Sequence, residues 1–495
     1  MSVAIQSSVL GPGWVDNETV VVSGRNPLAV EQQVAAGVRI NAPGISTQTR
    51  VARYYVLHPL IAAEAAKRDL DNESFRQLLR RVEIAFAAVA VAHERHPQHR
   101  AWFPRPPGVR VISPQLTDGL EMRITAGDGP GEYTKARWGF SGQYAGPELA
   151  LHLRVGELFA PGDAFDESVV RTALGQVFEL ASLPKIDQEV AQQYPDLCIC
   201  QTVTSADGDL LARLFSGKPD EPGTQMGNLG ATMQMLAAAV SSGDMRENTV
   251  GLDLGTWIMY GSGIDAKSSE IWLRWRGLRL RAESVQAWRG LFAWLGQYLK
   301  DHGGAMDAYS LGKALAAQMP NGTVGAFLSE LPDIRHSNAA QEFQVRQSYP
   351  EPIADIAVLA LGAKRAALAS RDPDAQVLGF LGPRQRVELL SPKWMEDMLK
   401  DWQNRPMSEF GMWLCSTLLN RAHRVSMSKT RSRSGKFVVP ARILVRDDDV
   451  ARVNDEVTGL PTLRLSQLLE IGRQIGLFQV DSGVWELGNR GHYLK

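Results

Sequence analysis

The stretch NESFRQLLRRVEIAFAAVAVAH, residues 72–93, decides the fold class of this 495-residue chain. Its large apolar side chains recur three or four residues apart, at Phe75, Leu79, Val82 and Phe86, which is the spacing of one face of an α-helix. Residues 51–66 and most of residues 165–400 show helical spacing as well. The sequence therefore predicts a mainly α protein with small β elements, of the α+β class.

A chain of this length exceeds what one hydrophobic core usually covers, so several domains are expected. We predict an N-terminal α+β domain over residues 1–160 and a helical domain over residues 161–400. Residues 401–495 are predicted to form a C-terminal domain that combines a basic hairpin with a winged-helix-like module. Within the first domain, two alternating runs between residues 109 and 126 flank Thr117-Asp118-Gly119 and predict a β-hairpin.

The overall composition is that of an ordinary globular protein, with 44% hydrophobic and 22% charged residues. Because the formal net charge is only −1, a surface that binds polyanions would have to come from local segregation of charge. Residues 1–10 lack the pattern of a signal peptide, and no uncharged apolar run approaches the ~18 residues of a membrane span. We expect a cytoplasmic protein that does not contact a membrane.

The strongest local feature is a basic stretch between Arg421 and Arg446, whose 26 residues include eight cations and no acid. Its centre, SKTRSRSGK at residues 428–436, predicts a mobile loop, and residues 424–427 and 437–445 on either side predict strands. Lysine and arginine donate to phosphates and release condensed counterions, so the stretch predicts contact with nucleic acid, DNA rather than RNA. The predicted contact residues are Arg421, Arg424, Lys429, Arg431, Arg433, Lys436, Arg442 and Arg446. The alternative is a solvated surface loop that Asp447, Asp448 and Asp449 partly balance.

The end of the chain has the pattern of a helix followed by a hairpin. Residues 463–476 are amphipathic, with Leu465, Leu468 and Ile475 on the apolar side. Residues 477–480 and 484–487 alternate around Asp481-Ser482-Gly483, which is a short hairpin turn. This order predicts the end of a winged helix.

The cysteines and histidines predict no metal site when each motif is taken alone. Cys198 and Cys200 would lie side by side on a strand, but metal binding there needs a second pair of ligands, so buried thiols in a reducing compartment are expected. A zinc-protease helix needs two histidines four residues apart, whereas His93 and His96 are three apart and Pro97 ends the helix. We therefore interpret residues 93–99 as a polar helix terminus and expect no cofactor.

No motif identifies a reaction. A Walker A loop, a Gly-x-Ser-x-Gly elbow and a Rossmann fingerprint are all missing from the sequence. Residues 251–256 resemble the first phosphate loop of actin-like ATPases, but no second loop follows, and a tight turn between apolar strands is the expected structure. Whether the chain is an enzyme stays open, and a non-enzymatic role is favoured.

One family resemblance lies near the N-terminus, in Asn26-Pro-Leu28 and in APGISTQTRVARYY at residues 42–55. This passage resembles the opening of uncharacterised prokaryotic proteins that occur among anti-phage and DNA-modification genes. The resemblance implies a role in defence or DNA processing, and that family has no established catalytic residues to carry over. Arg50 and Arg53, which lie three apart on one helix face, are expected to pair with acids.

These observations favour a non-enzymatic, nucleic-acid-associated subunit of a bacterial anti-phage defence or DNA-processing complex. Its basic C-terminal loop would contact the phosphate backbone, and other protein subunits would be its partners. Two alternatives stay open. The chain could be an adaptor or scaffold for a partner ATPase or nuclease, or it could be a nuclease with a degenerate core.

Overall fold

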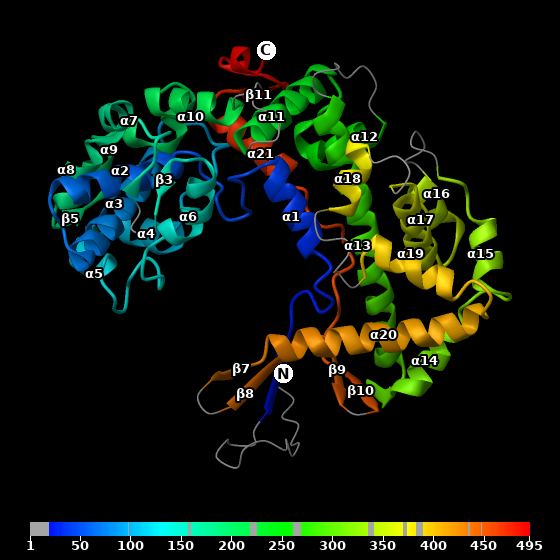
Figure 1. Cartoon of the computed structure of the whole chain (residues 1–495). Coiled ribbons are helices and arrows are strands. Elements are labelled where there is room, and N and C mark those ends of the chain that lie inside the picture. Colours follow the sequence, from blue (N-terminus) through cyan, green and yellow to red (C-terminus); the bar gives the residue numbers. More distant parts are fainter. Residues whose placement is uncertain are drawn as a thin grey trace. The chain divides into compact units, whose positions relative to one another are not determined.

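The structure is a computed structural model that describes residues 19–97, 99–156, 160–217, 225–260, 269–334, 341–369, 374–382, 390–433, 436–446 and 448–495. Helices dominate these residues, and their strands form small sheets of two or three strands (Figure 1). This confirms the predicted mainly α class with small β elements. In the described part of the chain, no helix is both long and apolar enough to cross a membrane.

The chain folds into two compact units, and each unit is assembled from separate parts of the sequence. Unit 1 comprises Met1–Gly37 and Leu273–Leu463, and unit 2 comprises Val38–Trp272 and Arg464–Lys495. The chain passes from one unit to the other within helix α1 (Gln32–Asn41) and within helix α13 (Ser269–Asp301). Unit 1 joins the N-terminal residues to an internal segment, and unit 2 joins an internal segment to the C-terminal residues. The predicted domains 1–160, 161–400 and 401–495 stay a prediction.

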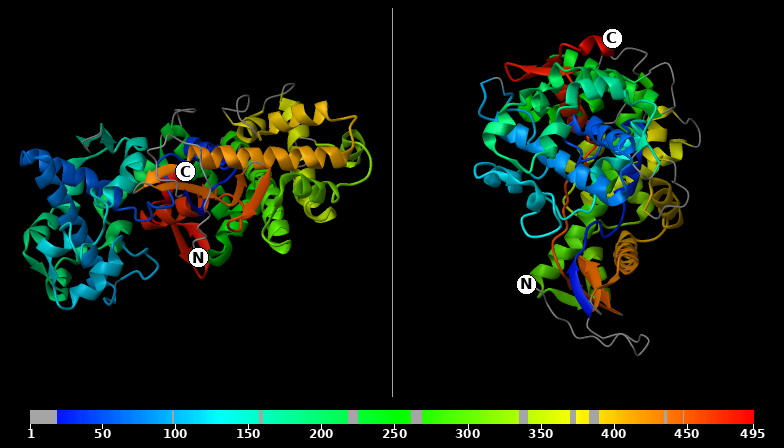
Figure 2. Two further views of the ribbon diagram at one scale, coloured as in Figure 1. Left: turned by 90° about the horizontal axis from the view of Figure 1, so that it is seen from below. Right: turned by 90° about the vertical axis from the view of Figure 1, so that its left-hand side faces the viewer.

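Helix α3 (Asn72–His93) is the centre of unit 2 and has the bounds that the sequence predicts. It begins where the Asp71 carboxylate accepts a hydrogen bond from the backbone N–H of Ser74 at 2.7 Å, which satisfies a free donor of the first turn. Phe75, Leu79, Val82 and Phe86 are buried on its apolar face. This face packs against α2 (Tyr54–Lys67), α4 (Val109–Leu116), α8 (Val177–Ser182) and α9 (Gln188–Gln192), as the views in Figures 1 and 2 show.

The core of unit 2 also contains a buried polar network around His58, whose side chain is 1% exposed. The ring donates to Glu148 from Nδ1 at 2.7 Å and to Glu83 from Nε2 at 3.1 Å. Glu83 also accepts from the backbone N–H groups of Phe140 and Ser141 at the start of α6 (Ser141–Ala150), a favourable position for an anion. Because both carboxylates and the ring are enclosed, we interpret this network as structural.

The remaining elements of unit 2 are short. Those of its first segment are β2 (Leu120–Glu121), α5 (Met122–Thr125), β3 (Arg154–Val155), β4 (Ala160–Pro161), α7 (Glu167–Leu174), β5 (Lys185–Ile186), the 3₁₀ helices η1 (Pro195–Leu197) and η2 (Ile199–Val203), α10 (Ala206–Ser216), α11 (Gln225–Ser241), η3 (Glu247–Thr249) and α12 (Val250–Tyr260). The C-terminal segment contains α21 (Leu465–Gln474), β11 (Phe478–Asp481), β12 (Val484–Leu487) and η4 (Gly491–Leu494). The helix and the antiparallel β11–β12 hairpin confirm the predicted order of elements, while a winged helix stays a prediction.

Three local predictions in unit 2 are wrong. Residues 109–126 form no hairpin. Their first part is helix α4, which buries Ile112 and Leu116, four residues apart on one face. Strand β2 in their second part pairs with the distant β5. Residues 251–256 lie inside helix α12, so they form neither a phosphate loop nor a turn between strands. Cys198 and Cys200 flank the start of η2 and do not lie on a strand.

Unit 1 combines helical pairs with two three-stranded sheets. Its elements beyond α1 and α13 are β1 (Thr19–Ser23), β6 (Ala305–Asp307), α14 (Ala308–Ala316), α15 (Val324–Glu330), α16 (Gln341–Ser348), α17 (Ile353–Ala369), α18 (Ala375–Leu381), α19 (Pro392–Asp401), α20 (Met407–Ser428), β7 (Arg431–Arg433), β8 (Lys436–Ala441), β9 (Ile443–Arg446) and β10 (Asp449–Arg452). Helix α20 packs against α14, and α17 packs against α19. The sheets have the strand orders β1-β8-β7 and β6-β10-β9.

Candidate functional site

The predicted basic stretch occupies the last turns of α20 and the strands that follow it in unit 1. Residues 424–427 were predicted as a strand but belong to α20, because Leu414, Leu418 and Val425 continue the buried helical spacing. A hairpin does follow the helix directly, but its arms are β7 and β8, which pair antiparallel (Figures 1 and 2). Residues 431–433, which the sequence places in the loop, therefore form a strand. Ser434 and Gly435, at the tip of the predicted loop, lie outside the described residues.

Three of the eight predicted cations contact other groups within unit 1. Arg421 donates to the backbone carbonyl of Leu28 at 3.0 Å, and the Lys429 ammonium donates to the carbonyls of Arg25 and Asn26 at 2.7 and 3.0 Å. These bonds fasten the N-terminal segment to the end of α20. The third is Arg442, whose Nε lies 3.6 Å from the largely buried carboxylate of Glu456.

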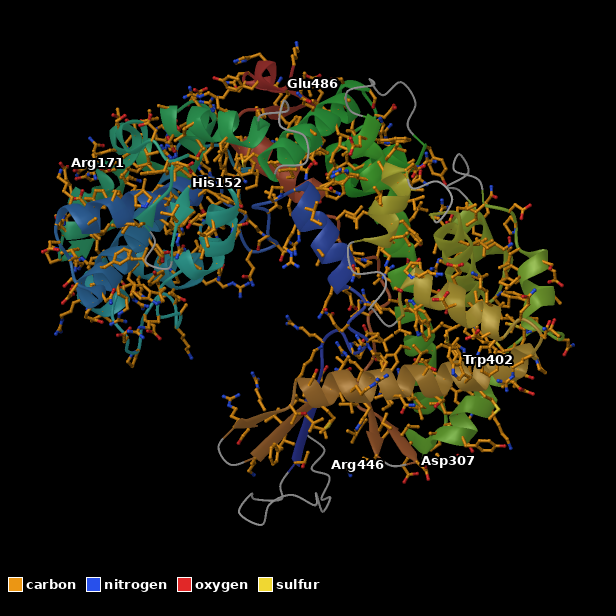
Figure 3. The ribbon with its side chains drawn as sticks, in the orientation of Figure 1. His152, Arg171, Asp307, Trp402, Arg446 and Glu486 are labelled. Atoms are coloured by element: carbon orange, nitrogen blue, oxygen red, sulfur yellow. The ribbon has the colours of Figure 1, made fainter. Side chains whose placement is uncertain are left out.

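Arg446 is separated from the hairpin because it ends strand β9 of the other sheet. Its cross-strand neighbour in that sheet is Asp449, which in turn lies opposite Asp307 (Figure 3). The carboxylates on these strands offset its charge locally, so we exclude Arg446 from the candidate site.

The remaining predicted cations gather at the hairpin. Arg431 and Arg433 share one face of β7 because side chains alternate along a strand, and Lys436 lies directly opposite Arg433 on β8. All three are exposed, as is Arg424 one helical turn before the end of α20. Arg424, Arg431 and Arg433 form no ion pair with any residue that the structure describes.

The base of the hairpin is fixed, although its basic face is exposed. Strand β8 pairs in parallel with β1, and two of its own side chains, Val439 and Ala441, are buried. The Ser426 hydroxyl donates to the carbonyl of Pro440 at 2.9 Å, which joins the hairpin to α20. At Gly24 a side chain would lie 2.8 Å from the backbone of Pro440, so only glycine allows this close approach.

This geometry suits an extended, multiply charged anion. Two cations directly opposite each other on paired strands repel and slightly destabilise the hairpin. Arginine offers a planar fork of donors that matches two phosphate oxygens, and lysine adds a point charge. A phosphate chain laid along the face formed by Arg431, Arg433 and Lys436 would convert this repulsion into attraction.

Sequence reasoning missed a second cluster, in unit 2, where His93 and His99 meet Cys198 and Cys200. One potential ligand atom from each of the four residues lies within 4.8 Å of the others. The sequence offers the two cysteines no second ligand pair nearby, and the histidine motif lacks the spacing of a zinc-protease helix. The fold brings the two motifs together. Their signal in the sequence is the pairing of His-x5-His with a distant Cys-x-Cys.

The two thiols of this cluster are free, buried and coupled to each other. The Cys198 thiol donates to Cys200 and lowers the pKa of Cys200, and the Arg100 backbone N–H and His93 act in the same direction. That hydrogen bond, together with burial, raises the pKa of Cys198 in turn. One proton is therefore held between the two sulfur atoms. The third cysteine, Cys415, is buried in α20, and burial raises its pKa to about 12.

Arg53, which the sequence predicted to pair with an acid, supports this cluster. Its guanidinium is 1% exposed and forms a two-pronged ion pair with Asp207, at 2.8 Å from Nε and 3.1 Å from Nη2. Its Nη1 also donates to the carbonyls of Asp196 and Cys198, at 2.7 and 2.6 Å. Structural pairing, the expected role, is confirmed for Arg53. Comparison of the chain with family models, with curated proteins and with solved structures gives no match.

Proposed function

We propose that this protein is a nucleic-acid-associated factor that contacts the phosphate backbone through the basic face of its β7–β8 hairpin. The observation that carries the proposal is the exposed pair of Arg433 and Lys436, opposite each other with Arg431 on the same face. Folding gains nothing from placing like charges in register, so a polyanion is the natural partner of this face. Arg424 extends the contact along the end of α20.

The geometry narrows the contact set from eight residues to four. Arg421, Lys429 and Arg442 have partners within unit 1, and replacing them would disturb the protein itself. The decisive variant therefore changes only Arg431, Arg433 and Lys436 to Gln. A matched control changes three exposed lysines on helices of the same unit, Lys300, Lys313 and Lys400, to Gln. Both variants lose the same net charge.

Binding of labelled duplex DNA, single-stranded DNA and duplex RNA is measured by fluorescence anisotropy across a series of salt concentrations. Each phosphate contact contributes about 0.9 to the slope of log affinity against log salt on duplex DNA, so the hairpin variant should lose roughly 2–3 from this slope. The control should keep the wild-type slope. Equal slopes in the hairpin variant and the wild type would refute the proposal. The affinities for the three nucleic acids show whether the protein prefers DNA or RNA.

We also propose that this contact serves a defence or DNA-processing complex with other protein subunits. The support for this part is the resemblance of residues 26–55 to the opening of proteins encoded among anti-phage and DNA-modification genes. Co-purification of the tagged full chain from its native host, with nuclease treatment to remove nucleic-acid bridges, tests it. Recovery of the chain alone would contradict the subunit role and leave the DNA-binding test unaffected.

A further inference from the structure

The cysteine–histidine cluster is built from two segments about a hundred residues apart. His93 is the last residue of α3, and His99 follows it after the turn that Pro97 introduces. Cys198 lies between the 3₁₀ helices η1 and η2, and Cys200 lies in the first turn of η2. Contacts between α3 and η1 hold the two segments together.

The distances within the cluster are those of a small-ion site. Cys200 Sγ lies 3.5 Å from His93 Nδ1, and Cys198 Sγ lies 4.0 Å from His99 Nδ1. With Zn–S bonds of about 2.3 Å and Zn–N bonds of about 2.0 Å, tetrahedral ligand atoms stand roughly 3.3–3.8 Å apart. The four potential ligand atoms of the cluster lie up to 4.8 Å from one another. Rotation of the side chains can bring them into the tetrahedral range.

His93 supplies an independent observation that points to a ligand. Its side chain is only 5% exposed, yet Nε2 has no hydrogen-bond partner among the described residues, and Nδ1 faces a sulfur atom. The His96 ring stacks on it at 4.8 Å, and the His99 ring meets it edge-on at 5.6 Å. A thiol is a weak hydrogen-bonding partner, so the buried Nδ1 of His93 is poorly satisfied unless a cation lies between it and the sulfur.

The backbone around the cysteines is held in place by surrounding donors. Arg53, fixed by Asp207, donates to the carbonyl of Cys198, and the Arg100 side chain donates to the carbonyl of Cys200 at 3.1 Å. These bonds orient the Cys-x-Cys segment before any ion binds. Such outer contacts are a regular part of metal sites in proteins.

We propose that His93, His99, Cys198 and Cys200 bind one Zn²⁺ ion in a closed, structural site. Two thiolates and two imidazoles form the S₂N₂ set that favours tetrahedral zinc, and four protein ligands leave no position for a substrate. Two thiolates balance the charge of the ion, so the loaded site is neutral, as its burial requires. On binding, the two thiols release their protons to solvent. The ion would clamp the end of α3 to the η1–η2 segment.

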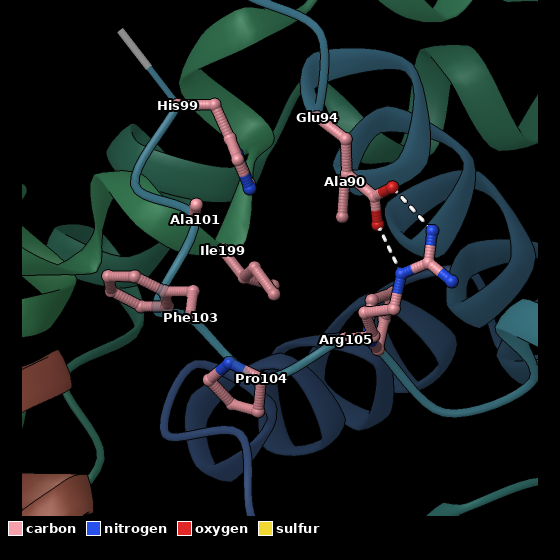
Figure 4. A pocket seen from close by; sticks show the side chains of 9 residues that line it. Ala90, Glu94, His99, Ala101, Phe103, Pro104, Arg105 and Ile199 are labelled. Carbon is pink, nitrogen blue, oxygen red and sulfur yellow. Dashed lines mark hydrogen bonds and ion pairs between the residues drawn. The ribbon is translucent and has the colours of Figure 1, made fainter.

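An entry path for the ion lies beside the cluster. A pocket of about 260 Å³ is lined by His99 and Ile199 on one side and by Glu94, Phe103 and Arg105 on the others (Figure 4). The His99 side chain points into this pocket, and Arg105 holds the Glu94 carboxylate with a bond of 2.7 Å. His99 is half-buried, whereas the other three candidate ligands are buried. His99 is therefore the ligand that an incoming ion meets first.

The first experiment uses the wild-type chain, so it does not depend on any variant folding. The protein is purified without chelators, and its zinc is measured by mass spectrometry and by release to a colorimetric chelator. We expect about one zinc per chain. Replacement by Co²⁺ should give the visible bands of tetrahedral cobalt and a near-ultraviolet thiolate-to-metal band. A preparation that holds no zinc after zinc supplementation, or a cobalt spectrum without the thiolate band, would overturn the proposal.

The second experiment assigns the ligands with matched pairs. Cys200→Ala is compared with Cys415→Ala, because both remove a buried thiol, and His99→Ala is compared with His96→Ala from the same turn. The zinc content of Cys200→Ala should fall below about a tenth of the wild-type value, and His99→Ala should weaken cobalt binding at least about tenfold. Both controls should stay near the wild type. Equal losses within either pair would place the metal elsewhere and refute the assignment.

Discussion

The basic hairpin of unit 1 and the cysteine–histidine cluster of unit 2 are opposite kinds of candidate site. The hairpin takes three charged residues from six consecutive positions, 431–436, and exposes them. The cluster takes its four residues from positions 93–99 and 198–200 and encloses most of them. A local run of charged residues can be recognised from the sequence without knowing the fold. An enclosed site exists only once the chain has folded and brought distant residues together.

The two sites also differ in what they contribute to the folded protein. Exposed cations are screened by water and salt, so removing them should alter binding and leave folding almost unchanged. Groups around the enclosed cluster were desolvated on folding, so removing one of them leaves its partner buried and unpaired. The predictions below test this division, beginning with the largest effect.

The largest effect is expected at the ion pair that supports the cluster. Asp207→Asn leaves the Arg53 charge buried without its partner, and we expect the free energy of unfolding to fall by about 3–5 kcal/mol. Urea-induced unfolding of the full chain, followed by circular dichroism, measures the loss. Because Arg53 positions the Cys198 carbonyl, cobalt affinity should also fall, by roughly 10–100-fold.

An exposed ion pair of similar geometry provides the contrast to Asp207. Arg405, which precedes α20, and Glu409 in its first turn are joined at 2.8 Å, and both side chains are about half exposed. Glu409→Gln should cost less than about 1 kcal/mol because solvent screens the pair. Losses of similar size from Asp207→Asn and Glu409→Gln would show that burial does not distinguish the two regions.

The same contrast explains what the sequence could predict. Helix α3 has the bounds that the sequence predicts because its signal is a local repeat of apolar residues. The C-terminal hairpin was predicted for the same reason, from a turn between alternating runs. Residues 109–126 misled the same reasoning, because a short alternating run fits a strand and an exposed helix edge equally well.

The cluster was out of reach because no local pattern describes it. The cysteine motif has no second ligand pair in its own segment, and the histidine motif lacks the four-residue spacing of a zinc-protease helix. The two motifs meet through the packing of α3 against η1 and through the bonds of Arg53, which connect residues more than a hundred positions apart. Side-chain partners of this kind also hold Arg421, Lys429 and Arg442 within unit 1.

A second, smaller effect is a pH dependence of the buried network in unit 2. Burial opposes a charge on His58, but Glu148 and Glu83 more than compensate and raise its pKa from 6.5 to about 9. Because the folded state binds this proton more tightly than the unfolded state, its stabilising contribution is complete below about pH 6.5 and is lost as the pH rises to about 9. The contribution is roughly 3–4 kcal/mol, since a tenfold difference in proton affinity is worth about 1.4 kcal/mol. Burial also raises the pKa of Glu148.

The comparison of wild type with His58→Gln isolates this contribution. Urea unfolding at pH values between about 6 and 9.5 should show the difference in stability shrinking as the pH rises. His423→Gln, at an exposed position on α20, serves as the control for the loss of an imidazole ring as such. A constant difference for His58→Gln would contradict the assignment of a protonated ring to the network.

The smallest effect is expected at the hairpin, where a stabilising change should weaken binding. Arg433→Glu places an acid opposite Lys436, so repulsion becomes attraction, and we expect the hairpin to gain about 0.2–1 kcal/mol. Arg431→Glu is the matched control, because Val438 lies opposite that position and provides no charge. Both reversals should weaken DNA binding by removing a phosphate contact, but only Arg433→Glu should stabilise the fold.

A double-mutant cycle shows whether the gain comes from the facing pair. In a Lys436→Gln background, the stabilisation by Arg433→Glu should disappear, because the partner of the new acid is gone. Hydrogen exchange of the β8 amides follows a local gain this small better than global unfolding does, since it reports opening of the strand itself. If Arg433→Glu still stabilises the hairpin without Lys436, repulsion between Arg433 and Lys436 is not what favours anion binding at this face. Only the exposure and the charge of these side chains would then support a nucleic-acid interface at the hairpin.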